Sequence, residues 1–549
     1  MMPEVARETA TGRQRLSVVI LAKNEEARIR RCLESVAWAD EILVVDGLSE
    51  DRTVELCRSA GATVISHAFE GSFAVERNLG MARATGDWVL QLDADDVVTP
   101  QLRAAVERIL ESPQPHVAFK FRRKSYLLGR FMRHGGWYHE LPNLVRRDVR
   151  YEGLVHERPR LSGTVGRIAA DVEHHPCSDL EGFLARHNRY TSLSAQELLA
   201  TQGRLDEAAL KDRLLRKPLK AFWKTYVKKQ GFREGLHGLV FSVFFAGVEL
   251  MKWAKYWELW AGIDTSARVP PLPAPGEARP VRGGRRATLS VVLMTKNEEP
   301  RLAACLDRVA GWADEIVVID DCSTDRTVEI ARRYTDRVQV AASGNNHDRQ
   351  WNRGIAASTR EWILHIDADE AVTPGLRAAI DEALDRAGDT AAFELMRLNV
   401  FLGRAMRHGG WRHRHRILFR RAGARCTGQG IHVQLQVDGR VVPLDAEIEH
   451  YPFTSLAQFL ERQNLYTTVE ARVRHAAGPR PTARTIYYQL TVRPIKLFWK
   501  SYAKQEGRRE GWHGLVFALL YAFTHAMYWA KVWSFSLTEP IAWPADPTE

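Results

Sequence analysis

The amino-acid sequence contains the same pattern twice. Residues 16–47 read LSVVILAKNEEARIRRCLESVAWADEILVVDG, and residues 289–321 read LSVVLMTKNEEPRLAACLDRVAGWADEIVVIDD. Solenoid repeats are roughly 20–50 residues long, so the much longer period here indicates a duplicated domain. The two copies form an internal alignment. Its later landmarks recur at an offset of about 274 residues: Asp46 and Asp320, Asn78 and Asn352, Asp93 and Asp367, Trp137 and Trp411, His156 and His432, Trp223 and Trp499.

The length of the chain agrees with a duplication. A chain of 549 residues is too long for one hydrophobic core and suits two domains. A segment rich in Pro, Gly and Arg separates the halves and predicts an extended linker. The predicted parts are an α/β domain at 16–178, a helical tail at 179–265, the linker at 266–287, a second α/β domain at 288–454 and a second helical tail at 455–540.

The composition is that of a globular protein, with 45% hydrophobic and 26% charged residues. The formal net charge of +11 is not accompanied by a nucleic-acid-binding motif, so we predict no nucleic-acid partner. Basic residues cluster beside aromatic and apolar runs, which favours contact with an anionic membrane surface. The six cysteines lack metal-ligand spacing and indicate reduced thiols in a cytosolic protein. We expect no signal peptide, because the first residues contain no apolar stretch.

Apolar strands alternate with helical segments in the first part of each half. In the first copy, strands are predicted at Ser17–Leu21, Glu41–Val45, Thr63–Ser66 and after Gly86, and Asp51 is predicted to cap a helix. This alternation predicts a doubly wound α/β fold with a parallel sheet. Ligands of such sheets bind beyond the carboxyl ends of the strands. Asp46 and Asp93 both follow a strand, so we expect them to face one cleft.

Paired carboxylates at these strand ends predict a metal site. Asp93 and Asp95 in the first copy, and Asp367 and Asp369 in the second, are separated by one alanine. Oxygen ligands suit Mg²⁺ or Mn²⁺, and such a cation would bind a diphosphate. A solvated acidic turn is the alternative interpretation. The residues predicted to bind the rest of a nucleotide donor are Lys23, Glu25, Asp46, Asn78, Asp93, Glu298, Asp320, Asn352 and Asp367.

Several motifs in fixed order resemble those of family 2 glycosyltransferases. They are strand-Lys-Asn-Glu-Glu, Trp-Ala-Asp-Glu-Ile, Asp-Arg-Thr-Val-Glu, Gly-Asp-Trp-Val-Leu-Gln-Leu-Asp-Ala-Asp and Arg-His-Gly-Gly-Trp, and the chain is most similar to the branch that contains lipopolysaccharide-core β-1,4-glucosyltransferases. The resemblance covers nearly all of each half. It implies two tandem GT-A domains with Rossmann-like, doubly wound mixed sheets, a nucleotide-sugar donor such as a UDP-hexose, a divalent metal, and inversion at the anomeric carbon.

An inverting transfer needs a general base for the acceptor hydroxyl. Glu140 and Glu157 are the candidates in the first half, where the related enzymes typically show Trp-Tyr-Pro-Asp and Val-His-Glu. The second half has Arg414 and Val433 at these places. Three interpretations of the second half are therefore open: it uses another base, it binds a donor without turnover, or it serves as a basic platform that binds the acceptor. Further acceptor-side candidates are His134, Trp137, His156, His408, Trp411 and His432. His174 and His450 are interpreted as buried, hydrogen-bonded histidines, with a role in the acceptor site as the alternative.

The tails combine lysines with aromatic residues at helical spacing, at Lys217–Lys229 and Arg493–Lys504. Apolar runs follow at Leu239–Val248 and Leu515–Phe523. These runs are shorter than the about 20 residues of a spanning helix, so we predict helices that lie in the membrane interface. Helices packed on the catalytic domain are the alternative.

Together the patterns predict a tandem glycosyltransferase on the cytoplasmic face of a bacterial inner membrane. It would move a hexose onto a lipid-linked saccharide during lipopolysaccharide-core or envelope polysaccharide synthesis. A polyprenyl-phosphate glycosyltransferase is one alternative. The other is that the second half is a non-catalytic module that binds a sugar nucleotide or the acceptor.

Overall fold

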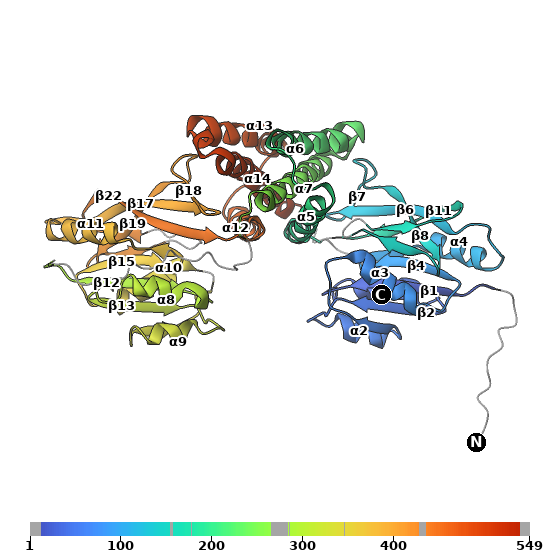
Figure 1. Cartoon of the computed structure of the whole chain (residues 1–549), viewed down its shortest axis with the longest axis horizontal. Helices are drawn as coiled ribbons and strands as arrows, with labels where there is room; N and C mark the ends of the chain where they lie inside the picture. Colours follow the sequence, from blue (N-terminus) through green and yellow to red (C-terminus); the bar gives the residue numbers. More distant parts are fainter. Residues whose placement is uncertain are drawn as a thin grey trace, which may run out of the picture. The chain divides into compact units, whose positions relative to one another are not determined.

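The computed structural model describes residues 13–153, 157–176, 178–264, 284, 286–344, 346–427 and 435–537. Two compact units make up the chain. The first contains the described residues up to Trp260 together with 467–492 and 523–537, and the second contains the described residues of 261–466 and 493–522. Each unit holds one mixed sheet with helices on it (Figure 1).

The elements of the first half follow the predicted alternation of strands and helices. Its sheet strands are β1 (Leu16–Ala22), β2 (Glu41–Asp46), β3 (Thr63–Ser66), β4 (Trp88–Asp93), β5 (Asp96–Val98), β6 (Ala118–Leu127), β7 (Arg130–Phe131), β8 (His139–Arg146) and β11 (Val165–His174). A separate hairpin is formed by β9 (Arg150–Glu152) and β10 (Arg158–Arg160). The helices are α1 (Ile29–Val36), α2 (Thr53–Ser59), α3 (Phe73–Arg83) and α4 (Pro100–Leu110).

The strand order of this sheet is β3-β2-β1-β4-β8-β6-β11-β5. The first four strands are parallel, as predicted. β8 then pairs antiparallel to both β4 and β6, which makes the sheet mixed and agrees with the GT-A expectation. The register places Ala22 of β1 opposite Asp46 and Leu21 opposite Asp93. The two aspartates therefore end the strands on either side of β1, at the same edge of the sheet.

The second half repeats this sheet with the order β14-β13-β12-β15-β19-β17-β22-β16. Its strands are β12 (Leu289–Thr295), β13 (Glu315–Asp320), β14 (Val338–Val340), β15 (Trp362–Asp367), β16 (Glu370–Ala371), β17 (Thr390–Phe401), β18 (Arg404–Ala405), β19 (His413–Arg420) and β22 (Arg440–Phe453), with β20 (Arg425–Cys426) and β21 (Leu435–Gln436) in a small hairpin. The helices are α8 (Glu299–Asp307), α9 (Thr327–Arg332), α10 (His347–Ala357) and α11 (Pro374–Asp385).

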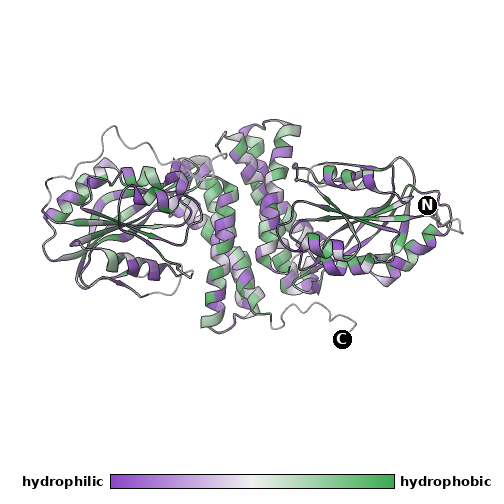
Figure 2. Cartoon of the chain, turned by 90° about the horizontal axis from the view of Figure 1, so that it is seen from below, coloured by the Kyte–Doolittle hydropathy of each residue, from purple (hydrophilic) through white to green (hydrophobic). Residues whose placement is uncertain are grey.

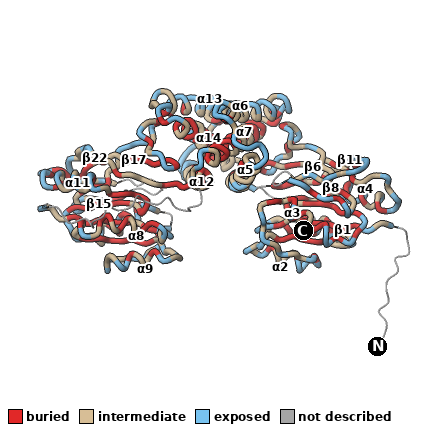
Figure 3. The backbone as a smooth tube through the Cα atoms, in the orientation of Figure 1, coloured by how far each residue is buried: buried red, intermediate tan, exposed pale blue. Residues whose placement is uncertain are grey.

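The central strands are apolar because helices cover both faces of the parallel part of each sheet. β1 and β12 are buried along nearly their whole length, and Trp88 and Trp362 are fully buried. Figure 2 shows hydrophobic residues along these strands, and Figure 3 shows the strands as buried. Cys32 and Cys305 are buried beneath the same sheets, as the internal alignment predicts.

The predicted cap at Asp51 differs in detail. α2 begins at Thr53, and Asp51 accepts hydrogen bonds from the backbone N–H groups of Thr53 (3.0 Å) and Glu26 (3.1 Å). The same side chain therefore ties the start of the helix to the loop after β1. Asp325 repeats both contacts in the second half, to Thr327 and Glu299.

The first tail contains α5 (Leu180–Gln202), α6 (Glu207–Phe222), a π-helical turn at Trp223–Lys228, a 3₁₀ turn at Gly231–Glu234 and α7 (Gly235–Trp260). The second has α12 (Leu456–Ala477), α13 (Ala483–Trp499), a π turn at Lys500–Lys504, a 3₁₀ turn at Gly507–Glu510 and α14 (Gly511–Phe535). Among the described residues, the segments 231–260 and 507–535 are long and apolar enough to cross a membrane, and 56% and 72% of their most apolar windows are buried within the protein.

Candidate active site

A cavity of about 780 Å³ lies at the carboxyl ends of β1 and β4 in the first half. Its wall includes Lys23 and Glu25 from the loop after β1, and Asp93 and Asp95 from the end of β4. Arginines from several elements line it as well: Arg77, Arg123, Arg158, Arg186 and Arg189. The sheet register therefore brings the predicted aspartate pair and a set of cations into one cavity.

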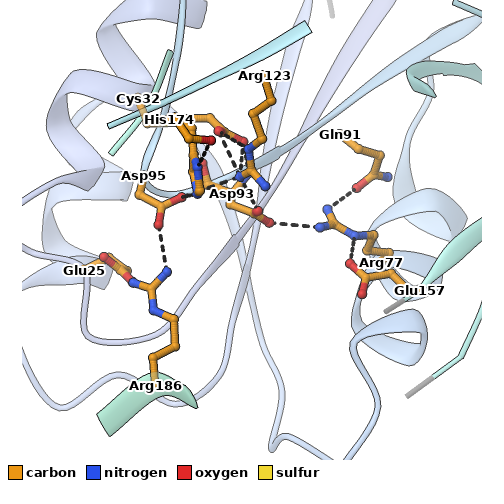
Figure 4. Close-up of polar contacts among 12 residues, drawn as sticks. Glu25, Cys32, Arg77, Gln91, Asp93, Asp95, Arg123, Glu157, His174 and Arg186 are labelled. Atoms are coloured by element: carbon orange, nitrogen blue, oxygen red, sulfur yellow. Dashed lines mark hydrogen bonds and ion pairs between the residues drawn. The ribbon is translucent and has the colours of Figure 1, made fainter. Parts of the chain in front are cut away.

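Asp93 is held between two arginines (Figure 4). Arg77 Nη2 lies 2.9 Å from Asp93 Oδ1, and Arg123 Nη2 lies 2.5 Å from Asp93 Oδ2. Burial opposes ionisation of this carboxyl group, but the charges of Arg123 and Arg77 hold its pKa far below its usual range. Asp93 is therefore a permanent anion at the end of β4.

Asp95 and its neighbours form a cluster of potential metal ligands. Ligand atoms of Asp95, Asp96 and His174 lie within 4.8 Å of one another. Asp95 Oδ1 is buried and accepts no hydrogen bond from the described residues, while Asp95 Oδ2 accepts one from Arg186 (2.9 Å). A buried carboxylate oxygen without a donor fits a cation. The predicted ligand Asp95 thus lies in this cluster, whereas the predicted ligand Asp93 binds arginines beside it.

Burial shifts the pKa values of Asp96 and His174, the two other members of this cluster. Burial, reinforced by the charges of Asp93 and Asp95, raises the pKa of Asp96 to about 7 against the effect of Arg123. Burial and Arg123 lower the pKa of His174 to about 3, so its ring is neutral at pH 7. Its Nδ1 lies 3.0 Å from Ser125 Oγ. His174 is therefore a buried, hydrogen-bonded histidine, as predicted, and His450 repeats this arrangement with Asn399.

The residues predicted to bind the donor have different surroundings. Glu25 lines the cavity, where burial raises its pKa to about 7 against the charge of Arg28, and Glu298 pairs with Arg301 in the second half. The carboxylates of Asp46 and Asp320 are buried and accept hydrogen bonds from the backbone N–H groups of Ser49 and Ser323. Asn78 and Asn352 bond the backbone of Tyr151 and Cys426. Asp46, Asn78 and their counterparts thus shape loops around the strand ends.

Of the two glutamates predicted as bases, one lines the cavity and the other does not. Glu157 lines the cavity, and its Oε1 lies 2.7 Å from Arg77 Nε. Glu140 is the cross-strand partner of Arg122 and forms ion pairs with Lys120 (3.1 Å) and Arg167 (2.5 Å). The structure therefore brings Glu157 to the aspartates and directs Glu140 elsewhere.

The residues predicted on the acceptor side connect the sheet to the tail of the same unit. His134 Nδ1 lies 2.8 Å from Glu234 Oε1, and His408 Nδ1 lies 2.9 Å from Glu510 Oε1. The rings of Trp137 and Phe241 are 5.1 Å apart, and those of Trp411 and Phe517 are 4.9 Å apart. These contacts fix the glycine-containing loop before β8 or β19. His156 and His432 lie outside the described residues.

The second half keeps part of this network. Arg397 Nη2 lies 2.9 Å from Asp367 Oδ2, as Arg123 does from Asp93, and His450 Nε2 lies 3.4 Å from Asp369 Oδ2. Trp351 occupies the position of Arg77 and stacks on His365 with ring centroids 3.5 Å apart. The arginine that bridges two carboxylates in the first half is thus replaced by an aromatic pair.

Comparison with known proteins identifies the family. The model of the family described as "Glycosyl transferase family 2" matches residues 17–164 and 290–436, once in each half. The chain belongs to glycosyl transferase family 2. The two matches confirm that this glycosyltransferase is a tandem duplication, and they cover each mixed sheet up to the strand β11 or β22.

Relatives of this glycosyltransferase match about one half of it. An uncharacterized glycosyltransferase of Rickettsia typhi is 25% identical over 261 residues, which cover 45% of this chain and 88% of that protein. The lipopolysaccharide core biosynthesis glycosyltransferase LpsC of Rhizobium meliloti is 25% identical over 266 residues, 44% of this chain and 92% of LpsC. A lipopolysaccharide-core enzyme is thus among the proteins to which the chain is similar.

Solved structures with detectable similarity include residues 1–349 of Staphylococcus aureus TarS, at 16% identity over 45% of this chain and 92% of that one, with a TM-score of 0.21. Mannosyl-3-phosphoglycerate synthase of Rubrobacter xylanophilus has 18% identity over 35% of this chain and 76% of that one, with a TM-score of 0.26.

The sequence interpretation of the glycosyltransferase missed the arginines around the aspartates. Arg123 and Arg186 contact Asp93 and Asp95, and their counterparts Arg397 and Arg462 lie near Asp367 and Asp369. The signal was present in the sequence, because both arginines recur at the repeat offset. It was overlooked because arginines in strands and helices are usually assigned to the surface.

Proposed function

We propose that this family 2 glycosyltransferase transfers a hexose from a nucleotide-sugar donor, with a UDP-hexose as the first candidate, to a lipid-linked saccharide with inversion of configuration. The observation that carries the proposal is the cavity in which Asp93 and Asp95 face five arginines. Guanidinium groups bind phosphate oxygens in a bidentate manner. A diphosphate leaving group would develop negative charge at this wall, where fixed cations stabilise it.

Asp95, with Asp96 and His174 beside it and Asp93 close by, would hold the Mg²⁺ or Mn²⁺. When bound, this cation would supply positive charge to the departing diphosphate. Arg123 and Arg186 neutralise the aspartates in the same cavity. In the second half, Asp367 and Asp369 with Arg397 and Arg462 support a second donor site of the same kind.

The similarity to LpsC supports a role in lipopolysaccharide-core or related envelope synthesis, with the acceptor anchored in the inner membrane and the active sites on its cytoplasmic face. The tail offers a surface for this location. Leu219 and Trp223 are 70% and 61% exposed, and their counterparts Ile495 and Trp499 are 61% and 57% exposed. Lysines flank all four, as in helices that bind anionic membrane surfaces.

The test uses the full chain and labelled UDP-, GDP- and ADP-hexoses, with extracted core glycolipid as the acceptor and Mg²⁺ or Mn²⁺ present. We expect one donor to give labelled glycolipid and free nucleoside diphosphate. The substitutions D93N and D95N should each reduce this transfer by at least about 10²-fold. D148N, which changes an exposed aspartate, serves as the matched control. Equal activity of D95N and wild type would contradict the metal assignment.

Two alternatives to this function predict different experimental outcomes. A polyprenyl-phosphate glycosyltransferase would form a lipid product that mild acid cleaves. A non-catalytic second half would leave the transfer rate of D367N unchanged while D93N abolishes it. Transfer that survives in D93N and disappears in D93N/D367N would instead assign turnover to the second half.

A further inference from the structure

Both halves have a histidine at the first position of the strand that closes the site. His139 begins β8 and His413 begins β19, at the repeat offset. His139 lines the cavity of the first half together with Asp93. It is the direct cross-strand partner of Arg123, and His413 is that of Arg397. Directly opposed residues on neighbouring strands point to the same face. Each histidine therefore lies on the face from which an arginine reaches the strand-end aspartate.

The hydrogen bonding of His139 fixes where its lone pair lies. Its Nδ1 is 3.3 Å from the carbonyl oxygen of Trp137, and Nδ1 of His413 is 3.1 Å from that of Trp411. A carbonyl oxygen only accepts, so Nδ1 carries the proton and Nε2 keeps its lone pair. Burial and the charge of Arg123 lower the pKa of His139, which favours the neutral ring.

The alternative proton acceptors are committed to other partners. Glu157 accepts a hydrogen bond from Arg77. The second half has Trp351 at the position of Arg77 and Val433 at the position of Glu157. Arginine and glutamate are thus present together in one half and replaced together in the other. This pattern is expected of a glutamate that positions an arginine.

Glu140 shows a similar exchange on the other face of the sheet. It pairs with Lys120, and the second half has the reversed charges, Arg414 and Glu394, at these two positions. In the second half the Glu394 carboxylate pairs with Arg416 (3.0 Å), and Arg414 donates to the backbone oxygen of Glu394, so the position of Glu140 carries no proton acceptor there. Of the groups considered, only the histidine is kept in both halves on the cavity face.

We propose that His139 is the general base of the first half and that His413 is its counterpart in the second. This inference rests on the proposed glycosyl transfer. The acceptor oxygen forms a bond to the anomeric carbon as the bond from that carbon to the diphosphate oxygen breaks. The electron pair of the broken bond leaves with the nucleoside diphosphate. The hydroxyl proton passes to His139 Nε2 and then to water.

The second half holds its histidine in a pair. His413 Nε2 lies 2.5 Å from Nε2 of His415, a residue that replaces Leu141 of the first half. Because His413 Nδ1 donates to Trp411, His415 must donate to His413 Nε2. An acceptor hydroxyl has to displace His415 from this nitrogen, so we expect slower transfer in the second half than in the first.

The experiment is made in a full chain carrying D367N, which isolates the first half. We expect H139A to lower the rate of transfer by about 10²-fold or more, to bind UDP in the presence of Mn²⁺ as tightly as the parent, and to regain part of its rate with added imidazole. H139Q tests the same loss with a side chain of similar reach. His116, whose Nδ1 lies 3.0 Å from Thr164 Oγ1 outside the cavity, provides the matched control H116A.

Unchanged transfer by H139A and H139Q would overturn the proposal. A loss of both transfer and UDP binding in H139A, with no recovery of the rate in imidazole, would also overturn it. Failure of the proposed glycosyl transfer itself has a different signature. In that case the parent chain releases no nucleoside diphosphate from any sugar nucleotide, whichever residue stands at position 139.

Discussion

At the scale of single residues, the Arg77–Glu157 pair is expected to behave as a unit. Removing one partner of a buried ion pair costs about 3–5 kcal/mol because a charge is left uncompensated. E157V should therefore lower the unfolding temperature and weaken donor binding. The combination R77W/Q91H/E157V installs the residues of the second half and should recover most of the lost stability. Calorimetry measures the unfolding temperature of both variants. A lower unfolding temperature for R77W/Q91H/E157V than for E157V would refute this coupling.

Lys255 is a second residue with a defined expectation. Its ammonium is buried in the tail and contacts the main-chain oxygen of Asn188 and the hydroxyls of Thr191 and Ser192. Burial lowers its pKa to about 7 despite nearby Glu258. Lys531 is the counterpart in the second tail, with a pKa also lowered by burial to about 7.

These shifts predict how stability depends on pH. An unfolded lysine has a pKa of about 10.4, so between about pH 7 and pH 10 the unfolded chain binds the proton that folded Lys255 releases. The free energy of unfolding should therefore increase with pH over this range, and the cost of charging Lys255 is fully present below pH 7. K255M should flatten this dependence. Denaturant unfolding of the wild type and K255M at pH 7 and pH 9 measures how much the free energy of unfolding of each changes with pH. Equal changes in the two proteins would show that Lys255 stays charged in the folded state.

At the scale of elements, α6 and its π turn carry the prediction for membrane contact. The long helix α7 is largely buried, which favours the packed-helix alternative for that segment. The two most exposed apolar residues of this tail, Leu219 and Trp223, lie instead on α6 and the π turn, among lysines. The surface expected to contact lipid is therefore the preceding element.

L219S/W223S should reduce co-sedimentation with vesicles of phosphatidylethanolamine and phosphatidylglycerol. Loss of two anchoring side chains removes roughly 1.5–3 kcal/mol each if both are fully buried in the interface. V340S removes an exposed apolar side chain from the edge strand β14 and serves as the control. Equal vesicle binding of all three chains would exclude this surface.

Some elements follow directly from the sequence and others do not. Strands β1, β2 and β4 have apolar runs that only a sheet covered on both faces accommodates, so their positions and parallel order could be predicted. The antiparallel placement of β8 between β4 and β6 depends on long-range pairing, which no local pattern encodes. The π turns were predicted as ordinary helix because their residues have ordinary helical spacing.

The candidate site shows the same division. The strand-end aspartates could be located because the ends of parallel strands share one edge. The role of Glu140 depends on the face that it occupies, which requires the register of β6 against β8. The role of Glu157 depends on its ion pair with Arg77 of α3, a contact between segments far apart in the sequence. His139 was overlooked because a histidine beside a glutamate has no distinguishing spacing.

At the scale of the whole molecule, the duplication predicts two donor sites per chain. Calorimetric titration with UDP and Mn²⁺ should give a stoichiometry of about two, since both halves keep the aspartate pair and its two arginines. D93N and D367N should each reduce it to about one. A single site in the wild-type chain, removed by only one of these changes, would show that one half has lost donor binding.

The pairing of β6 with β8 also limits how this site can change over time. Since successive residues of β8 alternate between the two faces, His139 and Leu141 meet the cavity while Glu140 meets Lys120 and Arg167 on the other face. A slip of β8 by one residue against β6 would exchange these sets and bring the carboxylate inside. A histidine-based and a carboxylate-based proton acceptor are thus separated here by one step of strand register, a change that no substitution at position 139 reproduces.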